Sequence, residues 1–218
     1  MTDFENRSII SGIGQSDIGR KLGRTELDLT LDAARAAIAD AGLSVDDIDG
    51  LAAYPGAMMG GPGGFAGPGT PSVQDAMRLK LNWHSGGGEG PAQIQAVINA
   101  VMAVGAGLAR HVLVYRTVTE STAQGEGGRA GIGLPGSGMG GGGGGAPKMG
   151  GTFQWLIPMR AYSAACWLAM CAQRHMHEFG TTQEQLAQIA LNGRRHAGRN
   201  PNAIFSEPMT MDDYMNSR

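Results

Sequence analysis

The sequence predicts an α/β domain with a mainly parallel sheet and helices on both faces of that sheet. Two short apolar runs, residues 8–14 and 50–54, end at a glycine and before a proline, as buried strands often do. A stretch with helical spacing of apolar residues separates them. This β-α-β order makes the two strands parallel. A third β-rich run, residues 111–116, follows a long apolar helix, which extends the α/β pattern.

The first helix and its surroundings carry clear boundary signals. Thr25 is expected as the N-cap, and Gly42 as the C-terminal stop. Ser44 predicts a second cap followed by a short helical turn, and Pro55 ends the second strand. The helix itself is predicted from apolar residues at helical spacing, namely Leu27, Leu31, Ala34, Ile38 and Ala41.

A glycine-rich turn, residues 84–90, leads into the most apolar helix of the chain. Residues 56–71 before it are a loop by composition, and Ser72 is expected to cap a helix over 72–81. Residues 92–108 hold no charged side chain, so a helix there has little polar face. We expect that helix to be buried on most sides.

After residue 118 the composition changes. Residues 119–151 are mainly glycine, alanine and serine with six consecutive glycines at 140–145, so we expect a flexible loop or lid. Helices are expected at 158–178, from Thr182 to Arg195 behind a capping box, and again from Thr210. The predicted domains are an α/β domain at 1–118 and a loop domain at 119–218, and the sheet looks truncated.

Bulk properties exclude several classes of function. The 218 residues carry a formal net charge of −2, which gives no reason to expect nucleic acid or an anionic membrane as partner. No apolar run approaches the roughly 20 residues of a membrane span, and the polar start predicts no signal peptide. Cys166 and Cys171 lie in an apolar helical run and are expected as buried, reduced thiols of a cytoplasmic protein.

The turn at residues 84–90 is the main candidate site. A helix that opens on glycines points bare N–H groups at whatever lies before it, which suits an anion or a polarised carbonyl. Gly87, Gly88 and Gly90 are therefore the expected substrate or oxyanion contacts, and His84 and Glu89 the catalytic candidates. The alternative is a tight packing turn, in which Glu89 only complements the helix dipole and His84 is structural.

Arg116 and Glu120 follow the carboxyl end of the third strand, where ligands gather in open α/β sheets. They are candidates for a contact to substrate or to a partner subunit. The alternative is that Arg116 pairs with Glu120 or another acid.

Two further patterns carry little weight. Cys166 and Cys171, with His175 and His177 nearby, do not have the spacing of a zinc site, so no metal is expected. Residues 131–136 match the dinucleotide fingerprint, but no predicted strand precedes them and no helix follows.

Several segments together resemble the thiolase superfamily. Residues 9–16, the helix at 30–42 and the link at 45–50 resemble its opening, and residues 177–187, 200–203 and 207–210 resemble its sterol-carrier or lipid-transfer branch. The ordered combination covers nearly the whole chain, which looks like the N-terminal half of such a protein. The resemblance implies a truncated thiolase-like α/β fold with a loop region.

The resemblance also implies a chemistry. Thiolases carry a nucleophilic Cys in a pattern close to Cys-Ser-Thr-Gly before the apolar helix, and the matching position here is Gly87. Thiolase-type acyl-enzyme chemistry is therefore not expected. The branch that lacks this Cys includes aldolases acting on steroid-CoA thioesters, dimeric and usually with a small OB-fold partner of zinc-ribbon type. No cofactor is implied beyond CoA as part of the substrate.

We therefore expect a protein that binds an acyl-CoA thioester and cleaves a carbon–carbon bond, or that transfers lipid. Three alternatives stay open. The chain is a non-catalytic acyl-CoA or lipid binder or a scaffold subunit; it is a nucleotide-dependent reductase; or it is a true acetyl-CoA acyltransferase using Cys166 or Cys171.

Overall fold

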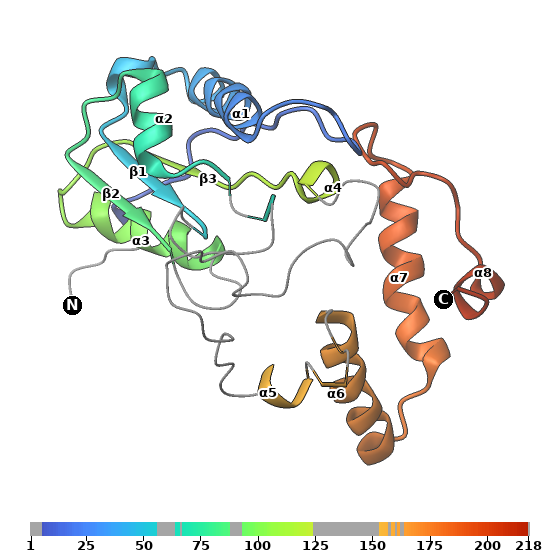
Figure 1. Cartoon of the computed structure of the whole chain (residues 1–218). Helices are drawn as coiled ribbons and strands as arrows, with labels where there is room; N and C mark the ends of the chain where they lie inside the picture. The colour runs from blue at the N-terminus through green and yellow to red at the C-terminus, as the bar shows by residue number, and fades with distance from the viewer. Residues whose placement is uncertain are drawn as a thin grey trace. The chain divides into compact units, whose positions relative to one another are not determined.

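A computed structural model gives the fold (Figure 1). It describes residues 6–55, 64–65, 67–87, 93–123, 153–156, 158–159, 161 and 164–217. The chain forms two compact units, Met1–Gly143 and Gly144–Arg218, which are described separately. The domain boundary predicted after residue 118 stays a prediction, because residues 124–152 lie outside the described part.

The first unit is built on a parallel sheet with strand order β2-β1-β3. The strands are β1 (Gly50–Ala53), β2 (Trp83–Gly86) and β3 (Val112–Tyr115). Both pairs are parallel and in register, with Ala53 opposite Gly86 on one side and Tyr115 on the other. The parallel sheet is confirmed, but we expected only a turn where β2 lies. Pairing with β1 orders this short segment, and its own sequence gives no strand signal.

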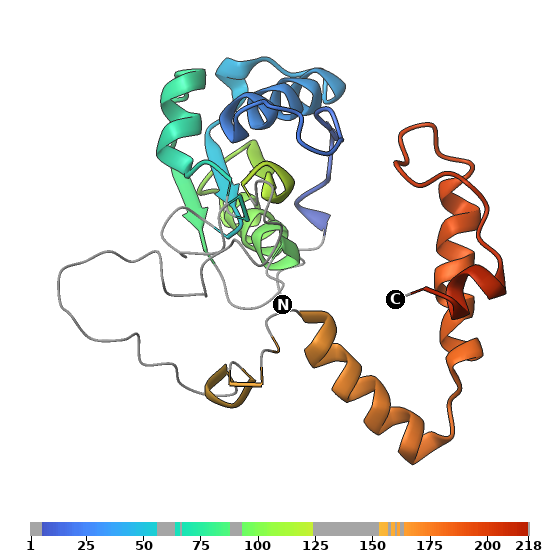
Figure 2. The same cartoon turned by 45° about the vertical axis from the view of Figure 1, so that its right-hand side comes forward.

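Helices cover both faces of the sheet, as predicted. The helices α1 (Glu26–Asp40) and α2 (Thr70–Met77) lie on one face and α3 (Gln93–Gly105) on the other (Figures 1 and 2). Alternate strand residues point to opposite faces, which divides the core in two. The α1/α2 side includes Ala34, Ile38, Leu51, Val73 and Leu113; the α3 side includes Ala52, Tyr54 and Ala96.

The boundaries of α1 agree with the predicted capping residues, whereas α2 begins earlier than predicted. The Thr25 side chain accepts a hydrogen bond from the Asp28 N–H, and Gly42 has φ of +67° just after the helix, both as predicted. The short helix η2 (Val45–Asp47) follows Ser44, also as predicted. However, α2 begins at Thr70 behind Gly69, because Pro71 suits the first helical turn.

The segment of residues 8–14 corrects our expectation of a buried strand. It has no strand structure, and Ile9 and Ile13 are 88% and 76% exposed. Residues 8–14 contact the helices and do not pair with a strand of the sheet. The Ile13 N–H donates to the Asp40 carboxylate at 2.9 Å, and a Cβ on Gly14 would lie 2.1 Å from the Ala33 carbonyl oxygen of α1. Its glycines therefore dock directly on the α1 backbone.

The helix α3 is buried on one face only, so the expectation of burial on most sides is wrong for the described structure. Ala96, Ala100 and Ala103 are buried toward the sheet. A second row, Ile94, Ile98 and Met102, is 72%, 50% and 51% exposed. The described part of the chain supplies one sheet face for this helix and covers no more of it.

The rest of the described chain is helical. The short helix α4 (Glu120–Ala123) follows β3 in the first unit, and the second unit holds α5 (Phe153–Leu156), α6 (Ala164–Phe179), α7 (Gln183–Ala197) and α8 (Met211–Met215). The capping box at Thr182 and the helix start at Thr210 are present as predicted, and Thr210 also forms a capping box that we did not predict. Gly180, with φ of +67°, directly follows α6.

The expected burial of Cys166 and Cys171 is wrong, since both are free and exposed. Their helix, α6, contains no buried residue among its described side chains. Within the described residues, no helix combines the length and apolarity that crossing a membrane requires.

Candidate active site

The carboxyl ends of the three strands form the candidate site. Because Ala53 lies opposite both Gly86 and Tyr115, the strands end level with one another. Tyr54, Gly87 and Arg116 are the first residues beyond these ends. Gly86 and Tyr115 flank the central strand, so their backbones lie two strand spacings, or about 10 Å, apart. Two predicted site residues, Gly87 and Arg116, thus lie at the same edge of the sheet.

Gly87 makes the turn that leaves β2. Its φ is +101°, a conformation that side chains with a Cβ rarely adopt, so glycine is required here. Its N–H donates to the Ala53 carbonyl at 3.3 Å and thereby extends the β1–β2 ladder. This amide is therefore engaged, and an oxyanion contact would depend on the next N–H groups. Gly88, Glu89 and Gly90 lie outside the described residues.

Arg116 lies between two aromatic rings. Its guanidinium carbon is 5.1 Å from the centre of the Tyr54 ring and 4.8 Å from that of Phe65. Tyr54 is itself buried and packs with Ala96, near the start of α3. The cation is thus fixed beside the strand ends by cation–π contacts. We did not predict Tyr54 or Phe65 as site residues; the position of Tyr54 at the end of a predicted strand was the available signal.

The backbone around Phe65 is tied to the end of β3. The Tyr115 hydroxyl donates to the Pro68 carbonyl at 3.0 Å, and the Thr119 N–H donates to the Gly64 carbonyl at 2.7 Å. Burial raises the pKa of Tyr115, which keeps this hydroxyl protonated as a donor. Gly64 and Pro68, on either side of Phe65, are therefore attached to the end of β3.

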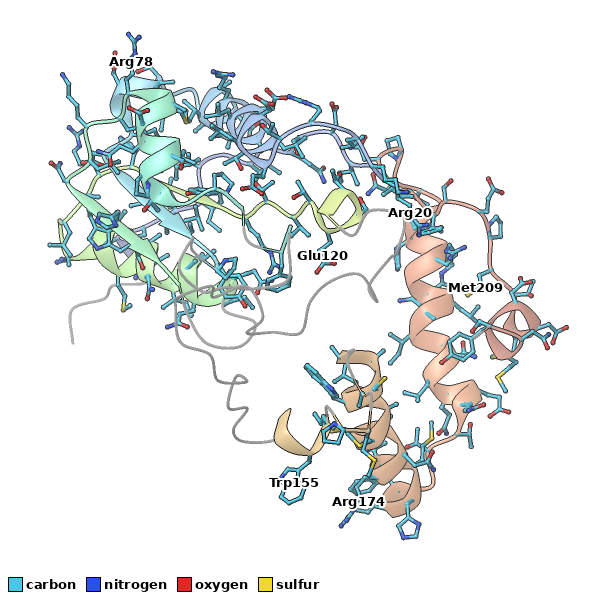
Figure 3. The ribbon with its side chains drawn as sticks, in the orientation of Figure 1. Arg20, Arg78, Glu120, Trp155, Arg174 and Met209 are labelled. Atoms are coloured by element: carbon cyan, nitrogen blue, oxygen red, sulfur yellow. The ribbon has the colours of Figure 1, made fainter. Side chains whose placement is uncertain are left out.

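His84 lies apart from this group, whereas the backbone of Glu120 lies beside Gly64, the neighbour of Phe65. His84 is exposed on the edge strand β2, three residues and about 10 Å before Gly87. It shares the sheet face of Leu51, the face covered by α1 and α2. Glu120 begins α4, and Figure 3 shows its side chain projecting outward from that turn. Their proposed roles remain predictions.

Two hollows meet at Arg116 and Thr117, which line both of them. One, of about 510 Å³, lies between residues 7–14, α1, α3 and the outer edge of β3. The other, of about 720 Å³, lies between residues 13–22 and residues 116–118. Both volumes fall in the range of small-molecule sites.

The described residues hold no cluster of three or more His, Cys, Asp or Glu side chains that could bind a metal ion. The fingerprint-like residues 131–136 lie outside the described part of the chain. The site as described thus offers aromatic, guanidinium and backbone groups.

Comparison with known proteins agrees with this fold. No protein-family model matches the chain. It is 35% identical over 227 residues to a steroid side-chain-cleaving aldolase of Thermomonospora curvata, covering 100% of this chain and 52% of the relative. It is 32% identical over 216 residues to the 17-hydroxy-3-oxo-4-pregnene-20-carboxyl-CoA lyase of Mycobacterium tuberculosis, covering 99% and 52%. The chain spans about half the length of the curated relatives it matches.

Solved structures give the same result. The Ltp2-ChsH2(DUF35) aldolase matches with a TM-score of 0.75 and 32% identity, over 96% of this chain and 48% of that one. The acetyl-CoA acetyltransferase of Syntrophomonas wolfei matches with a TM-score of 0.53 and 18% identity, over 88% and 46%, which supports the fold alone.

These similarities define the class of the protein: it is thiolase-like, with the α/β fold that the sequence predicted. Within that class, the chain resembles the steroid-CoA aldolase branch, because the relatives named above are similar to it over nearly all of its own length.

Proposed function

We propose that the whole protein cleaves a carbon–carbon bond in an acyl-CoA thioester, with steroid-CoA thioesters as the substrate class. The observation that carries this proposal is Gly87, with φ of +101°, at the turn where the resemblance to thiolases would place a nucleophilic Cys. The relatives that match the full chain are named as an aldolase and a CoA lyase, which supports cleavage without an acyl-enzyme.

The reaction proposed is a retro-aldol cleavage of a β-hydroxyacyl-CoA. A base takes the β-hydroxyl proton, the oxygen electrons form a carbonyl, and the Cα–Cβ bond breaks. Its electron pair moves to the thioester as an enolate, which is then protonated at Cα. The products are a ketone or aldehyde and a shortened acyl-CoA, and no oxidant, reductant or water is consumed.

The role proposed for this chain is chiefly electrostatic. The positive end of the α3 dipole and the Arg116 guanidinium, held by Tyr54, lie on the side of the sheet where the thioester oxygen would gain charge. Fixed dipoles that stabilise developing charge can lower a barrier by several kcal/mol, about 2.7–4 for one donor in known cases. His84 and Glu89 remain the candidates for proton transfer.

The proposal extends to partners and location. A DUF35 partner subunit is supported by the solved aldolase whose name includes DUF35, and we propose that this partner is of OB-fold, zinc-ribbon type. We further propose a homodimer in the cytoplasm that uses no cofactor other than the CoA of its substrate.

The test is to incubate the full-length protein and its DUF35 partner with a β-hydroxyacyl-CoA that carries a steroid. Mass spectrometry should detect a ketone or aldehyde and the shortened acyl-CoA in equal amounts. Each subunit alone and a substrate without the β-hydroxyl serve as controls.

Two results would contradict the proposal. Tight substrate binding with no product under any condition would favour a binding or scaffold role. An acyl adduct on Cys166 or Cys171 in the intact mass would favour acyl transfer.

A further inference from the structure

We propose that the hollow between residues 13–22 and residues 116–118 binds the apolar ring system of the substrate, with Arg116 at its inner end. We call it the Ile18 groove; its aliphatic lining is Ile13, Ile18, Leu22, Leu29, Ala33 and Val118. This inference rests on the proposed function for the identity of the ligand. It goes beyond the proposed function in giving a location for the part of the substrate that does not react.

The groove is apolar at its surface as well as at its base. Leu29 of α1 is 5% exposed and forms part of the floor. The walls hold Ile13, Ile18 and Val118, which are 76%, 51% and 46% exposed. Large aliphatic side chains around one hollow, in contact with solvent, are typical of a surface that a ligand covers.

The groove also lies in the right place. Thr117 and Val118 directly follow β3 and Arg116, so one end of the groove is the carboxyl edge of the sheet. Ligands of open α/β sheets gather at this edge. A substrate with its thioester near Gly87 could therefore extend past Arg116 into the groove.

The outer wall of the groove is held by charges. Arg24 pairs with Asp17 at 3.1 Å and with Asp32 of α1 at 2.6 Å, so it joins the wall segment to the helix. Hydrogen bonding to Asp32 is the main factor that raises the pKa of Arg24, and Asp17 adds to it.

Two further hydrogen bonds connect the groove to neighbouring elements. The Lys21 N–H donates to the Ser121 hydroxyl of α4 at 3.2 Å, which gives the wall a second attachment. On the inner side, the hydroxyls of Thr117 and Thr30 share a hydrogen bond. Thr30 also donates to the Glu26 carbonyl, so Thr117 must be the donor in the shared bond. These hydrogen bonds attach the groove to α4 on its outer side and to α1 on its inner side.

The chemistry of the lining selects the occupant. The groove is lined by six aliphatic side chains and also by polar or charged ones, namely Gln15, Ser16, Asp17, Arg116 and Thr117. A mostly hydrocarbon ring system that carries a few polar groups matches this lining. The volume of about 720 Å³ is large enough for a fused ring system.

The experiment measures binding of a 3-oxo-4-pregnene-20-carboxylic acid, without CoA, to the protein in the presence of its DUF35 partner. Isothermal calorimetry should detect binding to the wild type that free CoA does not displace. Ile18→Asp should weaken it at least about tenfold, because a carboxylate would face the apolar ligand. The matched control is Ile204→Asp, at an isoleucine of similar exposure in the other unit, 53% against 51%, and it should not change the affinity.

A second variant tests the wall without placing a charge in the groove. Arg24→Ala should weaken steroid binding, whereas Arg174→Ala, which removes an ion pair with Glu178 on α6, should leave it unchanged. Thermal unfolding of each variant confirms that it is folded.

The inference is overturned if the steroid acid does not bind, or if Ile18→Asp and Ile204→Asp behave alike. It is also overturned if Ile18→Asp abolishes association with the DUF35 partner and leaves steroid binding intact. Because no turnover is measured, absent cleavage contradicts only the proposed reaction, and groove-independent steroid binding contradicts only this inference.

Discussion

At the scale of single residues, Asp49 organises the end of the sheet opposite to the candidate site. Its carboxylate accepts the N–H groups of Arg110 at 2.8 Å and His111 at 2.9 Å, just before β3. It also accepts the Asn82 amide at 3.1 Å, just before β2. Since Asp49 itself precedes β1, one side chain joins the beginnings of all three strands.

Asp49→Asn should lower the free energy of unfolding of the first unit and should make that free energy less dependent on pH below about 4. Partial burial alone would raise the pKa of Asp49, but the hydrogen bonds from His111, Arg110 and Asn82 hold this pKa below its usual value. A carboxyl group whose pKa is lower in the folded than in the unfolded protein stabilises the fold at pH values above its unfolded pKa. This stabilisation is lost as the pH falls through the folded pKa. We expect a loss of about 1–3 kcal/mol at pH 7.

Urea unfolding at several pH values checks this prediction. The wild type should lose stability as the pH falls below about 4, and the variant should lose less over the same interval. Asp46→Asn, at an exposed neighbour, is the control. A variant with the same pH profile as the wild type would contradict the role given to Asp49.

Gly87→Ala tests the turn at the candidate site. A residue with a Cβ at positive φ costs about 1–2 kcal/mol, and relief of that strain would move the turn. We therefore expect cleavage activity to fall by more than the loss of stability explains. Gly107→Ala introduces the same kind of strain at φ of +74° beyond α3, and it should reduce stability alone. Equal effects of both variants on activity would contradict a local role for Gly87.

At the scale of elements, helices could be predicted from the sequence where residues close in the chain determine their boundaries, and less well elsewhere. The ends of α1, α7 and α8 follow from side-chain caps within three or four residues, at Thr25, Thr182 and Thr210. By contrast, β2 is a strand because it pairs with β1, and no local sequence pattern predicts that pairing. Residues 8–14 have a strand-like sequence, but their contacts to α1 take precedence.

Arg116→Met should loosen the loop that carries Phe65 without removing the Tyr115 hydrogen bond. Methionine fills similar space but cannot make the cation–π contacts with Tyr54 and Phe65, each worth about 0.5–1 kcal/mol at partly exposed sites. Hydrogen exchange of the Thr119 amide, which is bonded to Gly64, should become faster. Arg116→Lys should restore part of the protection.

The outcome that contradicts this prediction is unchanged exchange at Thr119. In that case, the hydrogen bond from Tyr115 to Pro68 would be sufficient to hold the loop, and Tyr115→Phe should then show the larger effect.

At the scale of the whole molecule, the exposed row on α3 is the feature that the sequence least prepared us for. Composition correctly predicted a helix with almost no polar face, but burial of its second face depends on chain or partner that the described residues do not include. The candidate site was also only partly predictable. The sequence placed Gly87 and Arg116 at strand ends, whereas the contacts of Tyr54 and Phe65 with Arg116 arise from the tertiary structure.

Ile98→Lys measures whether that row is covered in the 218-residue protein in solution. At 50% exposure, a lysine there should change the free energy of unfolding by less than about 0.5 kcal/mol and should lower self-association at high concentration. Ala100→Lys, at a residue 6% exposed on the sheet side, should cost about 3 kcal/mol.

Chemical denaturation and sedimentation velocity check both variants. A large loss of stability in Ile98→Lys would show that the row is covered in solution, contrary to the expectation from the single chain.

The alanines on the inner side of α3 have a practical consequence for engineering. Because Ala96, Ala100 and Ala103 leave only a methyl group between helix and sheet, any larger residue there must push the helix away from the sheet. Libraries that test the proposed function should therefore keep these three positions constant and vary the aliphatic lining around Ile18, which lies outside the contact between α3 and the sheet.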